Sequence, residues 1–325
     1  MTPSAGSTRV FITGGAGFIG ANLVDYILER HGFCLRIYDN LSACSRANLD
    51  AVVRRHGADG RVQCVEGDIC DFERLCDAMT GHEAVVHLAA HTQVRQSIVD
   101  PRPHVAVNAE GTFNVIEAAR RTGARVFVFA SSNAAVGAQK PPINETMVPR
   151  PMSPYGAVKL YGEALCSAYY HSYGLNTVAL RFANAYGPFS GHKTSVVAKF
   201  LRKRRSGEAL EIYGDGGQSR DFVHAGDIAQ AICRVITCGP EATGLWGEIF
   251  QIATGRETRI VDLAREICRL TDGSEEALTF GEAMQGEICQ NFSDIGKAGA
   301  ILGFAPEVDL GVGLSTMWTE ESTRP

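Results

Sequence analysis

The 325-residue chain lacks the features that mark several special classes of protein. None of its ten cysteines forms a C-x-x-C pair, which argues against a zinc site or a disulfide framework. Most cysteines lie within apolar runs, so we expect free, buried thiols in a reducing cytoplasm. No apolar run is long enough to span a bilayer, and residues 1–8 contain no apolar signal core. We therefore expect a cytoplasmic protein without membrane association.

Long runs of charge are also scarce. The formal net charge is −5, and the only basic cluster is the short run Arg202-Lys203-Arg204-Arg205. We interpret this run as a solvated helix end, so no nucleic-acid partner is expected. Hydrophobic residues make up 45% and charged residues 21%, which is typical of a soluble globular protein. The length predicts one large domain or two coupled domains.

A glycine-rich turn near the start of the chain indicates a dinucleotide. Residues 9–13 form a short β-branched run, the sequence GGAGFIG follows at 14–20, and residues 21–30 have helical periodicity. A strand, a glycine turn and a helix in this order let the backbone approach a pyrophosphate at the helix N-terminus. The next predicted strand, residues 34–38, leads to Asp39, which would bond a ribose 2′-hydroxyl and favours NAD. The nearby Arg46 leaves NADP as an alternative.

Strands and helices alternate over roughly the first 185 residues. Further strands are expected at 62–66, 84–88, 125–130, 177–182 and 249–253, and helices at 72–79, 103–122, 155–173, 196–205, 228–236 and 259–270. This alternation predicts an α/β fold with a Rossmann-type doubly wound parallel sheet over residues 1–184. Residues 185–325 are expected to form a smaller α+β substrate domain, with elements from about 222–253 returning to the first. Ligands should bind at the carboxyl ends of the strands, near Gly14, Asp39, Ala89 and Ser132.

An acid/base group is predicted between residues 130 and 159. Ser153 and Pro154 are favourable residues for a helix start, which would place Tyr155 and Lys159 one above the other on one helical face. An ammonium near a phenol lowers its pKa, and a hydroxyl from Ser132 or Ser131 could hold a substrate oxygen beside it. Alone, however, the Tyr-x-x-x-Lys spacing is also common in ordinary amphipathic helices.

Other polar residues have two interpretations. Asp68 either contacts an adenine or caps the helix expected at 72–79. His87 and His91 are expected to be structural or to face the substrate, because no partner has metal-ligand spacing and no metal site is predicted. Asn108, among apolar neighbours, is expected to bond nearby backbone.

Taken together, these motifs resemble those of the extended short-chain dehydrogenase/reductases. They are GGAGFIG, Asp39, Asp68-Ile69, HLAA at 87–90, Asn108, the Ser131-Ser132 pair, Tyr155-x-x-x-Lys159, RFANAYGP at 181–188 and RDFVH at 220–224. Within that family the chain is similar to nucleotide-sugar epimerases of the UDP-glucose 4-epimerase type. The resemblance implies tightly bound NAD and a transient 4-keto sugar that exposes either face for reduction. It also implies that Tyr155 takes the proton of the sugar 4-hydroxyl, Lys159 lowers the pKa of Tyr155, and Ser132 holds the 4-oxygen.

The resemblance also implies two sets of binding residues. The cofactor set is Gly14, Gly17, Phe18, Ile19, Gly20, Asp39, Asn40, Asp68, Ile69, Leu88, Ala89, Ala90 and Asn108, with Tyr155 and Lys159. The substrate set, for a nucleotide sugar and most plausibly a UDP-sugar, is Asn133, Asn184, Lys193, Val197, Tyr213, Arg220, Glu287 and Asn291. A homodimer is implied as well, with helices around 105–119 and 158–170 paired across a two-fold axis.

The chain departs from the family pattern at several positions. Val136 stands where the family commonly has a tyrosine, and Met284 stands where a phosphate-binding arginine usually precedes an acid, here Glu287. Diphosphate binding could then fall to Lys193 or His192. Asn291 is expected at the gate beside the sugar, which leaves room for an N-acetyl group or a C6 carboxylate.

Two alternatives to an epimerase remain open. A dehydratase or decarboxylase of the same family would need further acid/base groups, and dehydratases have Asp-Glu where this chain has Asn133-Ala134. A non-catalytic NAD-binding regulator tends to lose the tyrosine or the lysine, and this chain keeps both.

Overall fold

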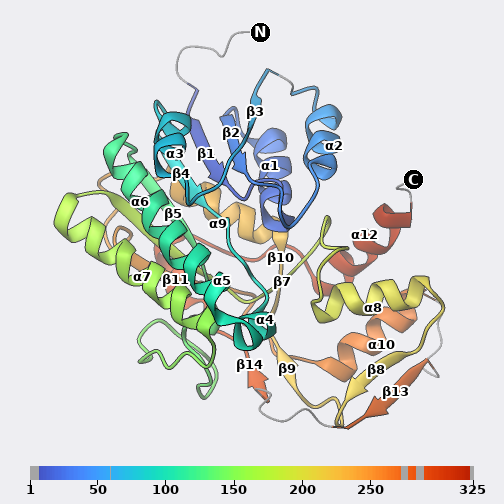
Figure 1. The fold of residues 1–325 in the computed structure, drawn as a ribbon. Coiled ribbons are helices and arrows are strands. Elements are labelled where there is room, and N and C mark those ends of the chain that lie inside the picture. Colours follow the sequence, from blue (N-terminus) through green and yellow to red (C-terminus); the bar gives the residue numbers. More distant parts are fainter. Residues whose placement is uncertain (1–6, 59, 272–276, 283–288, 323–325) are drawn as a thin grey trace.

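Seven parallel strands form the central sheet in the computed structural model of the protein (Figure 1). The structure describes residues 7–322 except 59, 272–276 and 283–288. The strand order is β11-β6-β5-β4-β1-β2-β3. The bounds are β1 Arg9–Thr13, β2 Cys34–Asp39, β3 Val62–Glu66, β4 Ala84–His87, β5 Val126–Ser132, β6 Asn176–Phe182 and β11 Glu248–Ile252. The predicted Rossmann-type sheet is therefore confirmed, and each expected strand agrees with an observed one to within two residues at either end.

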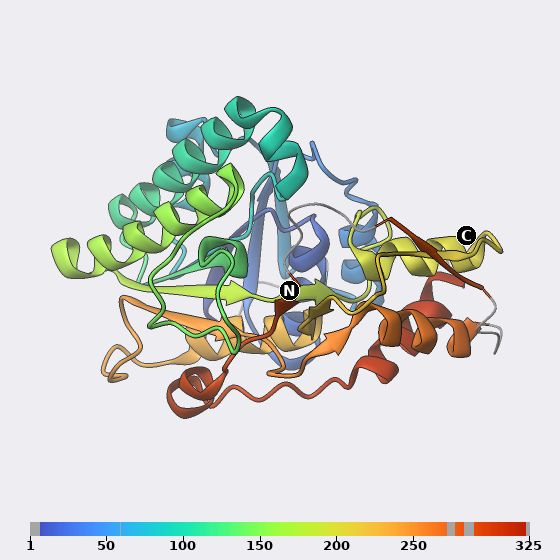
Figure 2. The ribbon, with the colours of Figure 1, turned by 90° about the horizontal axis from the view of Figure 1, so that it is seen from below.

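Helices cover both faces of this sheet (Figure 2). Successive strand residues point to opposite faces, so Val128 packs into one core and Phe127 and Phe129 pack into the other. The first core is covered by α1 (Phe18–Arg30), α2 (Ala47–Arg55) and α9 (Ala225–Thr237). The second is covered by α3 (Phe72–Met79), α6 (Gly111–Arg121) and α7 (Pro154–Tyr173). The carboxyl ends of the strands thus lie between two helical layers.

Helix α7 begins and ends where the sequence indicates. The Ser153 hydroxyl caps it by accepting a hydrogen bond of 3.1 Å from the N–H of Gly156, and Pro154 occupies its first turn. Gly174 ends it in the left-handed conformation, with φ of 69°. The prediction of a helix beginning at Ser153-Pro154 is confirmed, and it fixes Tyr155 in the first turn.

The helix predicted over residues 103–122 is divided by one wide turn. Its parts are α5 (Pro101–Val105), a π-helical turn (Ala106–Glu110) and α6. Asn108 lies in the π turn. Its side-chain oxygen accepts a hydrogen bond of 2.8 Å from the His91 N–H, and its side-chain nitrogen donates one of 3.0 Å to the His91 carbonyl oxygen. Such single π turns are frequent at functional sites because they redirect one side chain.

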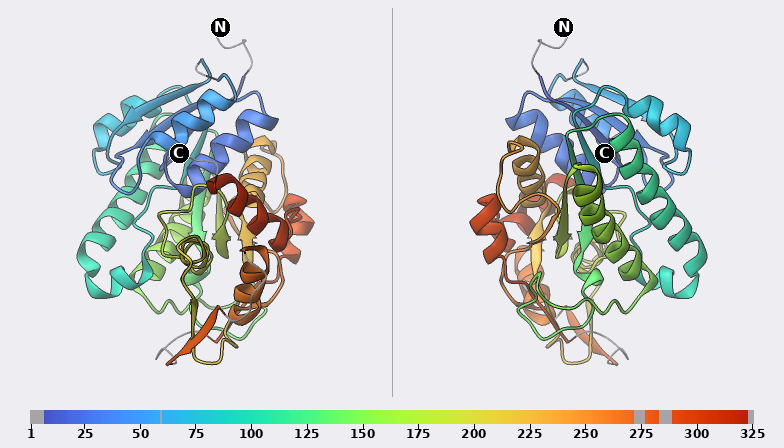
Figure 3. Two further views of the ribbon diagram at one scale, coloured as in Figure 1. Left: turned by 90° about the vertical axis from the view of Figure 1, so that its right-hand side faces the viewer. Right: turned by 90° about the vertical axis from the view of Figure 1, so that its left-hand side faces the viewer.

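Most of the elements after residue 184, apart from α9, β11 and α11 (Gly296–Leu302), form a second group to one side of the sheet (Figures 1 and 3). The group has its own core between α8 (Val196–Arg205), α10 (Ile260–Thr271) and α12 (Leu310–Ser322), around β8 (Leu210–Tyr213) and β13 (Leu278–Gly281). Two small separate sheets accompany it: β7 (Asn184–Tyr186) with β10 (Phe222–His224), and β9 (Ser219–Arg220) between β12 (Thr258–Arg259) and β14 (Gln290–Asn291). Within the described residues, the remaining helices are α4 (Val94–Val99), α11 and a 3₁₀ turn (Asn133–Ala135).

The predicted domain boundary at residue 184 remains a prediction, although β11 does pair with β6 at the edge of the main sheet. Among the described residues, no helix is long and apolar enough to cross a membrane.

Candidate functional site

The glycine turn after β1 brings the backbone of two strands into close approach. Gly14 has φ of +71°, and a Cβ atom there would lie 2.6 Å from the backbone nitrogen of Ala89. A Cβ on Gly20 would lie 2.4 Å from the Gly14 carbonyl oxygen. Gly17 is the N-cap of α1 without a side-chain hydrogen bond, so the N–H groups of Phe18 and Ile19 have no capping side chain. This open helix end beside bare backbone fits the diphosphate of a dinucleotide.

Asp39 lies at the end of β2, where the sequence places it, and it also holds the glycine turn. Its carboxylate accepts hydrogen bonds from the N–H of Ala16 at 3.0 Å and of Leu41 at 2.9 Å. The neighbouring Arg46, which left NADP open, donates to Asp50 at 2.9 Å in an exposed ion pair. The carboxylate at the strand end therefore fits a ribose diol, and the nearby guanidinium is engaged elsewhere.

Asp68 does not cap the helix that follows it. That cap is Asp71, whose carboxylate accepts from the N–H of Arg74 at 3.2 Å, so the capping interpretation of Asp68 is wrong. Asp68 instead accepts from the N–H of Cys70 at 2.8 Å and from the amide of Asn40 at 2.9 Å. The Cys70 N–H is the main reason why the pKa of Asp68 is lowered, and the Asn40 amide adds to it. The Ile69 side chain is buried in the sheet core, so only its backbone is left to meet a cofactor.

The loop after β4 is held in place from two sides. The Asn108 side chain is hydrogen-bonded to the backbone N–H and carbonyl oxygen of His91. The Thr13 hydroxyl lies 2.8 Å from His87 Nδ1. His87 Nε2 lies 3.0 Å from the Thr112 hydroxyl, and complete burial lowers the pKa of His87 to about 3. His87 is therefore a neutral structural histidine, and Leu88, Ala89 and Ala90 are left half-buried beside the glycine turn.

Tyr155 and Ser132 come together at the carboxyl end of β5. The side chains of the two residues are hydrogen-bonded, and the Ser132 hydroxyl also accepts from the N–H of Ala134 at 3.2 Å. The Tyr155 N–H donates to the hydroxyl of Ser97, a fully buried residue of α4, at 3.3 Å. Ser97 was missed by sequence reasoning because no local motif marks it. The hydroxyl groups of Tyr155 and Ser132 therefore meet where a substrate oxygen could bind.

Lys159 lies one turn along α7 from Tyr155, as predicted. Its ammonium donates to the carbonyl oxygen of Ala130 at 2.7 Å and lies 5.8 Å from the centre of the Tyr155 ring. Burial lowers the pKa of Lys159 to about 8, and the Glu163 carboxylate opposes this shift. Burial also raises the pKa of Tyr155 to about 12, and the Ser132 hydrogen bond offsets only part of that rise. The expectation that the phenol has a lowered pKa is therefore wrong for this arrangement, because the loss of solvent outweighs the Ser132 hydrogen bond.

Ser131 belongs to a different, buried network. It continues the row of Phe127 and Phe129 that faces α7, and its hydroxyl donates to Glu163 at 2.5 Å. Arg181 donates two hydrogen bonds to the same carboxylate, both of 2.7 Å, and both side chains are at most 1% exposed. The Ser131 hydroxyl is therefore engaged by Glu163, which argues against its predicted catalytic role. Sequence reasoning missed Glu163, although its position four residues after Lys159 places it on the same helical face.

Asn133 connects the catalytic strand end to the predicted sugar gate. Its amide nitrogen donates to Asn291 Oδ1 at 3.2 Å and to the Ser293 hydroxyl at 3.0 Å. Asn291 is paired in turn with Arg220, because β14 and β9 are parallel neighbours. Three predicted substrate residues therefore form one continuous wall that starts next to Ser132.

The two carboxylates that could have formed a salt bridge with Arg220 are engaged elsewhere. Asp221 is fully buried and accepts from Thr254, Gly255 and Ser293. Asp227 accepts from the N–H of Glu307 at 2.8 Å. Both carboxylates therefore hold neighbouring loops in place.

The remaining substrate candidates come from the second group. Asn184 is exposed on β7, and Val197 is 2% exposed in the core of that group. Tyr213 on β8 lies near Lys199, with 3.4 Å between its hydroxyl and the ammonium. Lys193 lies in the loop before α8 and is considered separately below. Glu287 and Met284 lie outside the described residues.

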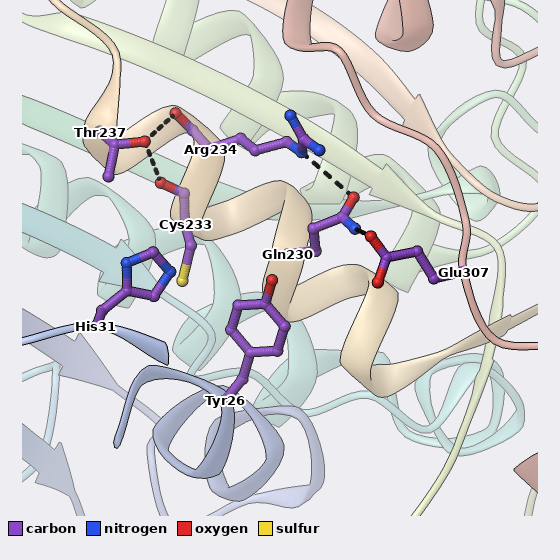
Figure 4. Close-up of a pocket in the computed structure, with 7 residues that line it drawn as sticks. All are labelled: Tyr26, His31, Gln230, Cys233, Arg234, Thr237 and Glu307. Carbon is purple, nitrogen blue, oxygen red and sulfur yellow. Dashed lines mark hydrogen bonds between the residues drawn. The ribbon is translucent and has the colours of Figure 1, made fainter. Parts of the chain in front are cut away.

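A hollow between α1 and α9 lies apart from all these residues (Figure 4). Its polar groups already bond one another: Gln230 donates to Glu307 at 2.6 Å and accepts from Arg234 at 3.3 Å. None of the predicted site residues lines it, so the candidate site is the region around Tyr155 and the glycine turn.

Comparison with known proteins identifies the family of the chain. Residues 10–253 match the NAD-dependent epimerase/dehydratase family. The chain is 33% identical over 320 residues to UDP-glucose 4-epimerase of Mycolicibacterium smegmatis, covering 94% of this chain and 96% of the relative. Its structure is similar to that of Thermotoga maritima UDP-glucose 4-epimerase with UDP-glucose, with a TM-score of 0.86, 30% identity and coverage of 98% and 100%. It is also similar to DesIV, a dTDP-glucose 4,6-dehydratase of Streptomyces venezuelae with NAD bound, with a TM-score of 0.86, 29% identity and 97% coverage of both chains.

The chain belongs to the NAD-dependent epimerase/dehydratase family of extended short-chain dehydrogenase/reductases. It is an NAD-dependent enzyme of the nucleotide-sugar epimerase and dehydratase type, and the predicted family and cofactor are confirmed.

Proposed function

We propose that the protein is a 4-epimerase of a nucleotide sugar, with Tyr155 as its acid/base. The observation that carries the proposal is the pair of hydroxyl groups of Tyr155 and Ser132 at the end of β5, above the Lys159 ammonium. The residues that follow Ser132 are Asn133, with an amide, and Ala134, with a methyl group. Tyr155 and Ser132 are thus groups that can move one proton on and off an alcohol. Residues 133 and 134 supply no further titrating group.

Each residue has a distinct part in this proposal. Ser132 holds the sugar 4-oxygen by a hydrogen bond, and Tyr155 takes the proton of the 4-hydroxyl and later returns it. When bound, the dinucleotide supplies the hydride acceptor and a positive charge beside the phenol. Burial raises the pKa of Tyr155 to about 12, so the phenol would first release its own proton to solvent, a step that the positive charge of the bound dinucleotide would favour. Lys159 stays fixed by the Ala130 carbonyl oxygen and contributes its charge from below the phenol.

The wall formed by Asn133, Asn291 and Arg220 is proposed to bind the rest of the substrate. Arg220 offers a guanidinium suited to the diphosphate, and Asn291 offers a small amide at the gate beside the sugar. Tyr213 is proposed to lie near the base, and Asn184 near the sugar or diphosphate. Because the Val197 side chain is 2% exposed in the core of the second group, only its backbone is proposed to lie near the base. This arrangement fits UDP-glucose and UDP-galactose, and equally UDP-N-acetylglucosamine or UDP-glucuronate.

Dehydration is the less favoured chemistry. Removing water from the sugar needs an acid and a base beyond Tyr155, and dehydratases have Asp-Glu where this chain has Asn133-Ala134. Here both hydrogen atoms of the Asn133 amide are engaged by Asn291 and Ser293. Asn133 therefore serves as a fixed wall rather than as a proton donor.

We also propose a homodimer formed through α6 and α7. Phe113 on α6 is 43% exposed, and Tyr161 and Tyr173 on α7 are 39% and 59% exposed. A second copy would remove these side chains from water. Sedimentation of a single monomeric species would contradict this assembly.

Turnover of UDP-sugars without added cofactor tests the proposed reaction. The purified protein should interconvert the 4-epimers of one UDP-sugar with no net formation of NADH, as followed by NMR of the sugar. Tyr155→Phe should abolish interconversion and retain NAD. Tyr26→Phe is the matched control, because Tyr26 lines the separate hollow between α1 and α9.

Three results would contradict the proposal. Loss of water or CO2 from the substrate would indicate a dehydratase or decarboxylase, and absence of turnover across UDP-, GDP-, CDP- and dTDP-sugars would indicate a regulator. Wild-type rates in Tyr155→Phe would remove Tyr155 from the reaction.

A further inference from the structure

The loop of residues 187–195, between β7 and α8, crosses from the second group to the main sheet. Near its start, the Pro188 carbonyl oxygen accepts a hydrogen bond of 2.8 Å from Asn22 of α1. Near its end, Arg202 of α8 donates to the carbonyl oxygens of Gly191 and Lys193, the latter at 2.7 Å. The loop is therefore fixed over the first turns of α1.

Lys193 extends from this loop to the far side of the glycine turn. Its ammonium donates to the Thr92 hydroxyl at 3.1 Å, in the loop after β4. Loss of solvent lowers the pKa of Lys193, and nearby Cys44 opposes part of this shift. Cys44 lies in the loop after β2, close enough to Asp39 for the two side chains to interact electrostatically. In the sheet β1 lies between β4 and β2, so Lys193 lies between the loops that flank the glycine turn.

The Lys193 ammonium has little compensation in this place. An ammonium has three donor hydrogens, and among the described residues the Lys193 ammonium donates to the neutral Thr92 hydroxyl. No carboxylate among the residues that the structure describes lies within ion-pair distance of it. A partly desolvated cation without a counter-ion has a strong preference for an anion.

The glycine turn presents matching positive character from the other side. Helix α1 has no side-chain cap at Gly17 and no acidic residue in its first turn. Its N-terminus and the Lys193 ammonium therefore both favour negative charge in the space between the loops after β2 and β4. A diphosphate is the anion that a dinucleotide places over such a turn.

We propose that Lys193 binds the diphosphate of NAD from the side opposite the glycine turn, so that the 187–195 loop acts as a strap that retains the cofactor. This assigns Lys193 to the cofactor rather than to the substrate diphosphate expected from the sequence. The inference rests on the use of NAD by the family and does not depend on epimerase activity.

Cofactor retention in Lys193→Met tests the strap. Methionine keeps the length of the side chain and removes its charge. We expect the affinity for NAD to fall by about 10- to 100-fold, the range for the loss of a hydrogen bond to a charged group. The measurements are the NAD content of the purified protein, by absorbance after acid release, and calorimetric titration of the stripped protein with NAD, ADP-ribose and UDP.

The comparison between ligands and variants identifies the anion. NAD and ADP-ribose share the diphosphate, so both should weaken to a similar extent, and the affinity for UDP should change less than twofold. Lys193→Arg should retain most NAD, because it retains the charge. Lys203→Met, in the adjacent α8, is the matched control and should leave NAD affinity unchanged.

Two results would overturn the inference. Weaker binding of UDP with unchanged NAD affinity would return Lys193 to the substrate diphosphate. Unchanged binding of all three ligands, with circular dichroism equal to that of the wild type, would show that Lys193 binds no diphosphate. Both outcomes are binding measurements that do not depend on epimerase activity. A failure of this inference can therefore be distinguished from a failure of the proposed function.

Discussion

The buried pair Arg181–Glu163 yields the sharpest prediction about stability. The guanidinium donates two hydrogen bonds of 2.7 Å to the carboxylate, and the side-chain exposures are 1% and 0%. Arg181→Met would leave that carboxylate with the Ser131 hydroxyl as its hydrogen-bond donor. Removing one partner of a buried ion pair costs about 3–5 kcal/mol, because the remaining charge is uncompensated. That is a large share of the roughly 5–15 kcal/mol by which folded domains are stable.

Urea unfolding followed by far-ultraviolet circular dichroism would measure this loss. The matched control is Arg256→Met, since Arg256 pairs with Asp309 at 3.5 Å with exposures of 77% and 64%. An exposed pair contributes about 0–1 kcal/mol, so the control should unfold nearly as the wild type does. The double variant Glu163→Met/Arg181→Met should be more stable than Arg181→Met alone, because it removes the orphan charge.

The reasoning would be refuted if Arg181→Met lowered the free energy of unfolding no more than Arg256→Met does. Additive losses in the double variant would refute it as well, since the two side chains would then act independently.

Two further predictions concern the cofactor turn and the buried histidine. Gly14→Ala should destabilise the fold by more than about 1 kcal/mol and should weaken NAD binding, as measured by calorimetry. The reason is that residue 14 has a φ of +71° and that the new Cβ atom would lie 2.6 Å from the Ala89 backbone nitrogen. Gly32→Ala, with no atom within 4 Å of its Cβ, is the control and should leave NAD binding unchanged; equal binding by both variants would contradict the close approach. The pKa of His87 falls from 6.5 to about 3 on folding, so only the unfolded chain takes up this proton as the pH falls through that range. The free energy of unfolding of the wild type should therefore fall relative to that of His87→Gln as the pH is lowered from about 6.5 to 3. Urea unfolding at several pH values would measure this difference, and parallel curves of unfolding free energy against pH would contradict a neutral buried His87.

Local chemistry explains why much of the fold could be predicted from the sequence. Ser153 and Pro154 start α7 through a cap and a fixed backbone angle, and Gly174 ends it with a left-handed angle. These effects act within a few residues, so they can be read without the tertiary structure. The strand order and the short pairs after residue 184 depend on partners distant in the chain, and the sequence analysis did not predict β8, β9 or β13.

The candidate site shows the same limit. Tyr155, Lys159 and Ser132 were expected together because one helix face and one strand end can be read from spacing. The orientation of Ser131 follows from strand alternation with Phe127 and Phe129, and that alternation was present in the sequence. The direction of the Tyr155 pKa shift could not be read from spacing, because it is set by burial under elements such as α4, whose existence was not predicted.

The face of α7 that carries Tyr155 also carries the charge that keeps Lys159 an ammonium. Burial favours the neutral form of both Tyr155 and Lys159, and the opposing influence on Lys159 is Glu163, one turn further along. Glu163 can stay ionised in the core because Arg181 and Ser131 donate to it. The buried pair between α7 and β6 is thus part of the support for the proposed acid/base group. Because Glu163 raises the pKa of Lys159, Glu163→Gln should favour a neutral amine at residue 159.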